Sequence, residues 1–205
     1  MRSAGKEIVM FWNFVERVVC VIGVLLFGWL GILIAFLVLI DSKGRIFFTD
    51  IRLGKNEQPI TVLKFRTMHN NVSDEDQQLL KRSREWQEYR KCHHDPRITK
   101  IGKYLRKFSL DELPQIFNVI YGNMSLVGPR PISAEENKLY GKYAKLIHSV
   151  KPGITGLWQV SGRNLLTYRR RVAINVYYVK NKSLKLDLWI LYKTIGAVIS
   201  GRGAW

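Results

Sequence analysis

The longest apolar stretch of the chain covers residues 18–40, which contain no charged side chain. Its length is close to the ~20 residues that a helix needs to cross a bilayer. It is longer than the ~7–15 residues of a signal-peptide core, and no small-x-small cleavage site follows it. Basic residues flank both ends, so charge asymmetry does not decide between a helix that crosses the membrane and one that enters and turns back. The stretch therefore predicts a membrane helix but does not decide whether it spans the membrane or is re-entrant.

Two short runs of β-branched and aromatic residues follow, at 46–48 and 60–63, on either side of a turn at 54–57. This pattern predicts a small β-hairpin. Further along, apolar residues recur at helical spacing, with Gly and Pro at the boundaries. The helices predicted from this spacing cover 98–108, 113–120, 139–147, 168–179 and 184–200, and a charged surface helix is expected near 76–90.

The helix predicted at 184–200 is apolar but also carries Trp189, Tyr192 and two lysines. This mixture favours a helix in the membrane interface over a core helix. The predicted fold is mainly α with a small β-hairpin (α+β). We expect a membrane helix at 1–41 and a cytosolic, membrane-associated domain at 42–205.

The charge balance is strongly basic. The chain of 205 residues has 33 Lys plus Arg against 16 Asp plus Glu, a formal net charge of +17. This excess predicts an anionic partner: nucleic acid, an anionic membrane surface or a phosphorylated substrate. Cys20 lies in the apolar stretch and Cys92 in a polar one. We do not expect them to form a disulfide, which indicates a reducing compartment.

Asp111 and Glu112 are adjacent acidic residues in this basic chain. An Asp that is ionised at pH 7 can attack phosphorus without a general base, and a neighbouring Glu can hold a divalent cation that screens the phosphate. The alternative interpretation is local. Ser109 and Glu112 have the spacing of a capping box, and acidic residues suit the first turn of a helix. Taken alone, the pair favours the local interpretation.

Basic residues recur in turns rich in Gly and Pro, where backbone N–H groups and cations can surround a phosphate. A single such residue is ordinarily a solvated surface position, but Arg130 stands between two prolines that fix the origin of its side chain. The run CHHD at 92–95 lacks the spacing of zinc ligands. The substrate-binding candidates are Lys64, Arg66, Arg106, Arg130, Lys151 and Arg163.

Taken in order, eight short motifs resemble one family, the bacterial sugar transferases or monotopic phosphoglycosyl transferases. Each motif alone is weak, whereas the ordered set is specific and covers nearly all of the chain from about residue 15. The motifs are KFRTM (64–68), DPRIT (95–99), SLDELPQ (109–115), GPRP (128–131), PGITG (152–156), GRN (162–164), YYV (177–179) and SGRG (200–203).

The resemblance implies an enzyme that moves a sugar 1-phosphate from a UDP-sugar to undecaprenyl phosphate, with Mg²⁺, and releases UMP. It implies that Asp111 is the nucleophile, that Glu112 serves the metal, and that Arg106 and Arg130 bind substrate. It also implies a re-entrant N-terminal helix and action on an anionic bilayer, at the cytoplasmic face of the bacterial inner membrane. Formation of a homo-oligomer stays open, and no nucleic-acid partner is expected.

The chain departs from the family pattern at four places. Gly28-Trp29 replaces the Ser-Pro pair that breaks the family's helix, so no proline enforces a kink. Lys43 replaces a proline in the turn that follows. Asn123 and Asn175 stand where the family has Asp. The last two changes remove carboxylates but leave the dyad intact, so we expect activity.

Two other functions compete with this interpretation. A membrane-anchored nucleic-acid-binding module would use the positive charge and the aromatic residues among the basic ones, but it gives the acidic dyad no role. A catalytically inactive scaffold would be consistent with the two lost carboxylates. Release of UMP from a UDP-sugar separates the enzyme from both.

Overall fold

The structure is a computed structural model that describes residues 2–69, 78, 80, 82–84, 86, 92 and 95–204. The surface helix expected near 76–90 therefore lies outside the continuously described parts. Mainly α-helical secondary structure surrounds two small sheets. The predicted α+β class is confirmed, although only one of the two sheets was predicted.

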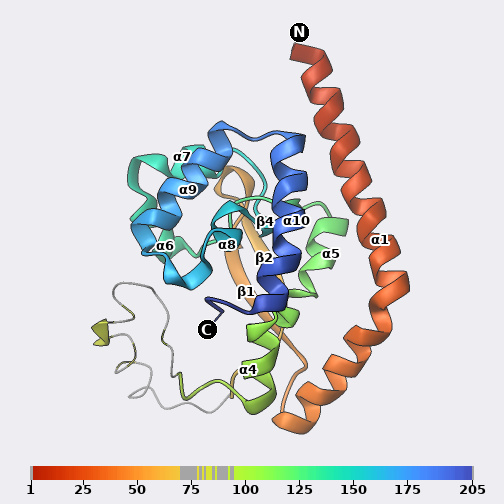
Figure 1. Ribbon diagram of the computed structural model, residues 1–205, viewed down its shortest axis with the longest axis vertical. Coiled ribbons are helices and arrows are strands. Elements are labelled where there is room, and N and C mark those ends of the chain that lie inside the picture. Colours follow the sequence, from red (N-terminus) through yellow and green to blue (C-terminus); the bar gives the residue numbers. More distant parts are fainter. Residues whose placement is uncertain are drawn as a thin grey trace.

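The N-terminal helix α1, Arg2–Asp41, is continuous through Gly28 and Gly31. It curves along one side of the molecule and lies next to α5 (Figure 1). From Met10 to Asp41 it is long and apolar enough to cross a membrane. One face is packed into the domain, with Cys20 buried at one level and Ile34 with Val38 at another. The opposite face is apolar and exposed, so α1 belongs to the core while offering an apolar surface outward.

The hairpin pairs β1, Phe47–Leu53, with β2, Pro59–Phe65, in antiparallel register around the short 3₁₀ turn Lys55–Glu57. This confirms the hairpin prediction. The side-chain amide of Asn118 joins the hairpin to the next helices: Oδ1 accepts from the Leu63 N–H at 3.2 Å, and Nδ2 donates to the Thr61 carbonyl at 2.6 Å. The hairpin is thereby fixed beside the segment that carries the acidic pair.

Helix α4, Lys100–Lys107, is capped by Thr99, whose side chain accepts from the Gly102 N–H. It is followed by the 3₁₀ turn η2, Leu110–Glu112, and by α5, Gln115–Ile120. The prediction of a helix at 98–108 is confirmed in its core, but the second helix begins two residues later than predicted. The capping-box interpretation of Ser109 is wrong, because Ser109 has left-handed backbone angles (φ 54°, ψ 23°) and makes no capping bond.

A second, parallel sheet pairs β3, Ser125–Val127, with β4, Gly153–Thr155. The sequence predicted only turns and loops here, since three-residue strands are too short to show periodicity. Gly153 permits the pairing: a Cβ at this position would lie 2.0 Å from the backbone nitrogen of Gly128. The sheet fixes the start of the Gly-Pro-Arg-Pro turn that carries Arg130.

The predicted helix at 139–147 is interrupted. The structure has α6, Ala134–Asn137, then the 3₁₀ segment η3, Lys138–Tyr143, then α7, Ala144–Ile147. The reason is Gly141, whose φ of 51° is not helical. The predicted apolar face at 139, 143, 146 and 147 is confirmed only at Ile147, which shares a core cluster with Val172, whereas Leu139 and Tyr143 are exposed.

Four further segments complete the chain: α8, Leu157–Val160; η4, Arg163–Leu165; α9, Tyr168–Lys180; and α10, Leu184–Ser200. The last two confirm the predicted helices. Helix α10 buries Asp187 and Ile190 and exposes an apolar outer stripe that includes Leu188, Tyr192 and Ile195. This amphipathic character is consistent with the interfacial position expected for it.

Candidate active site

A cavity of about 940 Å³ opens between the hairpin, the α4–η2 segment, the Arg130 turn and the α8–η4 segment. Both members of the acidic pair line it. The structure brings together residues that lie far apart in the sequence: Lys64, Arg106, Arg130 and Arg163 all line the same cavity as the pair. The wall is therefore strongly cationic around two carboxylates.

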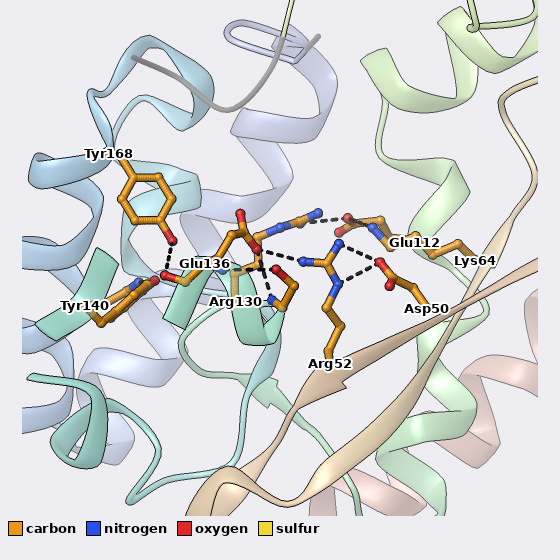
Figure 2. A network of polar contacts seen from close by, with 10 residues as sticks. Asp50, Arg52, Lys64, Glu112, Arg130, Glu136, Tyr140 and Tyr168 are labelled. Atoms are coloured by element: carbon orange, nitrogen blue, oxygen red, sulfur yellow. Dashed lines mark hydrogen bonds and ion pairs between the residues drawn. The ribbon is translucent and has the colours of Figure 1, made fainter. Parts of the chain in front are cut away.

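Glu112 is held by two cations. Its Oε1 accepts from Lys64 Nζ at 3.0 Å and from Arg130 Nη1 at 2.8 Å, as Figure 2 shows. Burial alone would raise the pKa of Glu112, but Arg130 and Lys64 outweigh it and hold the pKa far below its usual range. Glu112 is thus a fixed anion at neutral pH. Its proximity in turn raises the pKa of Arg130.

Asp111 differs from its neighbour. It is buried, with 9% of its surface exposed. Within the described part of the chain its carboxylate makes no hydrogen bond or direct ion pair, although Lys64, Arg106 and Arg130 act on it electrostatically. Burial and the adjacent negative charge of Glu112 raise the pKa of Asp111. The pair therefore consists of one carboxylate held by cations and one that is free to react.

Arg106 lies in the last turn of α4. A hydrogen bond from its Nε to Thr67 Oγ1, at 2.9 Å, fixes the direction of its side chain. Burial lowers the pKa of Arg106, while the charge of Asp111 acts in the opposite direction. An arginine remains charged at any physiological pH. Arg106 thus supplies a fixed positive charge to the Asp111 side of the cavity.

A second network beside Arg130 was not predicted. Arg52 on β1 lies between two carboxylates: its Nε donates to Asp50 Oδ2 at 2.7 Å and its Nη1 to Glu136 Oε2 at 2.8 Å (Figure 2). Asp50 and Arg52 also line the cavity. Their i, i+2 spacing on a strand puts them on one face, but nothing local in the sequence connects them with Glu136.

The other predicted substrate-binding residues have different surroundings. Arg66 lines the cavity but is buried, and its guanidinium donates to the carbonyls of Ser42 and Lys43, beyond the end of α1. Lys151 does not reach the cavity, and its Nζ donates to Asn13 Oδ1 on α1 at 3.4 Å. Arg163 lines the cavity, with Nη2 donating to Ser109 Oγ at 2.6 Å.

The two asparagines that replace family carboxylates lie away from the dyad. Asn175 is buried in α9, where its Nδ2 donates to the hydroxyl of Tyr140 at 3.1 Å. Asn123 lies in the turn after α5, with its N–H donating to the Asn118 carbonyl. Neither lines the cavity. Both replacements therefore lie outside the cavity that contains the dyad.

The carboxylates of the cavity could hold a magnesium ion only together with groups of a bound substrate. Among the described residues no three His, Cys, Asp or Glu side chains are grouped as a metal cage. Mg²⁺ is typically held by one or two carboxylates together with substrate phosphates and water. Glu112 can provide such a carboxylate, so the donor set suits a metal that arrives with a phosphorylated substrate.

Known proteins match the chain over most of its length. Exopolysaccharide production protein ExoY of Sinorhizobium fredii is 43% identical over 194 residues, covering 93% of this chain and 86% of that protein. The undecaprenyl-phosphate galactose phosphotransferase of Salmonella typhimurium is 43% identical over 166 residues, covering 79% of this chain and 35% of that longer protein.

The UDP-galactose-lipid carrier transferase of Erwinia amylovora is 44% identical over 178 residues, covering 85% of this chain and 37% of that protein. These relatives give no support to the nucleic-acid-binding alternative. Residues 9–201 match the protein family described as "Bacterial sugar transferase". The resemblance found in the motifs is confirmed, and the chain belongs to the bacterial sugar transferase family.

Proposed function

We propose that the protein transfers a sugar 1-phosphate from a UDP-sugar to undecaprenyl phosphate and releases UMP, as the first membrane step of surface polysaccharide assembly. The observation that carries the proposal is the asymmetry of the dyad. Glu112 is neutralised by Lys64 and Arg130, while Asp111 is buried without a hydrogen bond in the described part of the chain. A nucleophilic carboxylate needs a lone pair that is free to attack, and Asp111 meets this condition.

In the first step a carboxylate oxygen of Asp111 attacks the β-phosphorus of the UDP-sugar. The bond between that phosphorus and the bridging oxygen breaks, and its electron pair leaves with UMP. In the second step a phosphate oxygen of undecaprenyl phosphate attacks the phosphorus of the aspartyl-phosphosugar, and the carboxylate of Asp111 leaves. Two sequential displacements let one cavity serve two large substrates in turn.

The cations of the cavity serve both steps. A diphosphate brings negative charge next to Glu112, and that charge increases on the oxygen that leaves. Arg130, Lys64 and Arg106 are already oriented by contacts to Glu112 and Thr67, so little reorganisation is needed when charge develops. Bound Mg²⁺, held by Glu112, would neutralise further charge on the diphosphate.

We further propose that α1 is re-entrant, with both of its ends at the cytoplasmic face of the inner membrane. Near its start, Asn13 accepts from Lys151 and the buried Glu16 accepts from the Leu126 N–H. Beyond its other end, Arg66 donates to backbone carbonyls. A helix spanning the ~30 Å hydrocarbon core would separate its two ends by the whole membrane. The domain contacts α1 near both of its ends. These contacts therefore favour a position of both ends on the same side of the membrane.

The topology is testable with single cysteines at Ser3 and Lys43 in a Cys20→Ala, Cys92→Ala background. We expect a membrane-impermeant maleimide to label neither position in intact cells and both after permeabilisation. Labelling at position 3 in intact cells, with position 43 protected, would establish a spanning helix and overturn the proposal.

The proposed activity is tested by UMP release from a panel of UDP-hexoses and UDP-N-acetylhexosamines, with Mg²⁺, with and without undecaprenyl phosphate. Multiple turnover is expected only with the lipid phosphate, and at most one UMP per enzyme without it. Asp111→Asn is the matched control, because it retains the size of the side chain. Absence of UMP release from every sugar nucleotide would refute the proposal.

A further inference from the structure

Two residues beside the dyad have backbone angles that residues other than glycine rarely adopt. Ser109 has φ 54° and Arg163 has φ 52°, both in the left-handed region. The other non-glycine residues with positive φ in the described part of the chain are Asn56 and Glu57, in the hairpin turn. Such conformations are unfavourable and persist where the surroundings enforce them, often at functional sites.

The two left-handed residues are bonded to one another. Arg163 Nη2 donates to Ser109 Oγ at 2.6 Å, across 54 positions of sequence. Both residues line the cavity that contains the dyad. The contact therefore joins the α4–η2 connection to the start of η4, and each strained residue fixes the other.

The backbone next to Arg163 contacts the C-terminal segment of the chain. The Asn164 N–H donates to the Gly203 carbonyl at 3.2 Å. A Cβ at Gly203 would lie 2.8 Å from the Gly162 carbonyl oxygen and 3.2 Å from Arg163 Cβ, so only glycine fits there without displacement. The backbone around Arg163 is thereby fixed before any substrate arrives.

The Ser109 side leads directly to the dyad. The Ser109 carbonyl accepts from the Glu112 N–H at 3.2 Å and so closes the 3₁₀ turn that contains Asp111. A change in the backbone of Ser109 would rotate this turn. Because Asp111 makes no hydrogen bond of its own in the described part of the chain, the backbone of the turn is what orients its carboxylate.

Arg163 also has one donor to spare. Its Nη1 is buried and has no hydrogen-bond partner among the described residues. A buried donor without a partner is unfavourable. An oxygen of a bound phosphate would satisfy it.

We propose that Ser109 and Arg163 form a clasp that positions Asp111 for attack, with Arg163 acting through Ser109 as a positioning residue. The inference rests on the proposed function. It assigns to Ser109 a role in the reaction and gives Arg163 a task beyond adding positive charge to the cavity. Misplacing a reacting group by about 1 Å can lower a rate by about 10²-fold, which sets the size of the expected effect.

The test is a double-mutant cycle of Ser109→Ala, Arg163→Gln and the double variant, with kcat and KM for UMP release measured for each. We expect Ser109→Ala to lower kcat by about 10²-fold while KM for the UDP-sugar changes little, as for loss of an interaction that acts in the transition state. In the Arg163→Gln background, Ser109→Ala should have almost no further effect, because the clasp is already open.

Two more variants separate the clasp from other causes. Ser109→Gly relieves the backbone strain and should fold, but it lacks the hydroxyl, so its kcat should fall as in Ser109→Ala. Arg170→Gln removes one exposed arginine on α9 and should leave kcat unchanged. Thermal unfolding of every variant identifies any that fails to fold.

The outcomes are distinct. Additive losses in the cycle, or wild-type kcat in Ser109→Gly, would overturn the clasp and leave the proposed function intact. A wild-type protein that releases no UMP would overturn the proposed function, and the clasp with it.

Discussion

Removal of the Arg130 guanidinium is the most informative single change to the charge of the cavity. Arg130 Nη1 lies 2.8 Å from Glu112 Oε1, and the Arg130 side chain is partly buried, with 26% of its surface exposed. Opposite unit charges 4 Å apart interact by about 4 kcal/mol at an effective dielectric constant of 20. Loss of one preoriented donor to a developing oxyanion typically costs about 2.7–4 kcal/mol. We therefore expect Arg130→Ala to lower kcat/KM for UMP release by about 10²–10³-fold.

Two companions make the result interpretable. Arg170→Ala removes the same charge from an exposed position on α9 and should have little effect. Arg130→Lys keeps the charge but not the planar fork, so it should recover only part of the activity. The assay is UMP release at a fixed Mg²⁺ concentration, with the folded state checked by thermal unfolding. Equal losses for Arg130→Ala and Arg170→Ala would refute the reasoning, because only net charge would then matter.

Three further predictions follow from the same contacts. Asp111→Asn should abolish turnover, since a neutral amide cannot attack phosphorus, and wild-type turnover by this variant would exclude the mechanism. Glu112→Gln should fold but lose most of its Mg²⁺ dependence. The raised pKa of Asp111 means that UMP release should increase as pH rises through that pKa. It also means that ionised Asp111 destabilises the fold, so Asp111→Asn should unfold at a higher temperature than wild type at pH 7 but not at pH 4. Arg66→Ala should lower the free energy of unfolding by roughly 1–3 kcal/mol, because the part-buried carbonyls of Ser42 and Lys43 lose a charged donor. Unchanged stability with weakened UDP-sugar binding would instead place Arg66 in substrate binding.

The hairpin, α9 and α10 were predictable because each extends over enough residues for its periodicity to appear. The parallel pair β3 and β4 was not, because each strand has three residues and its partner lies far along the chain. The interruption at Gly141 was also missed, since the apolar spacing of 139–147 runs across it although Leu139 and Tyr143 are exposed in the folded chain. Local patterns thus predict elements, whereas tertiary contacts decide where short ones begin and end.

The site shows the same division. The dyad, Lys64, Arg106 and Arg130 were predicted from motifs, and the structure places them around one cavity. Ser109 was assigned to helix capping, an interpretation that fails because Arg163 takes its hydroxyl and the backbone turns left-handed. The Arg52 network gave no sequence signal, because its three members come from two elements that meet only in the folded chain.

A short path through the structure joins the apolar helix α1 to the proposed nucleophile, Asp111. Asp41 ends α1, and its Oδ2 accepts from the Ile101 N–H at 2.9 Å, in the first turn of α4. Helix α4 carries Arg106 near its other end and leads directly into the turn that contains Asp111. A shift of α1 against the domain would therefore move the proposed nucleophile Asp111 and Arg106 together. If α1 lies in the lipid phase with the proposed acceptor, it fixes the depth of Asp111 relative to that acceptor, which would explain why an apolar helix packs into the core of this domain.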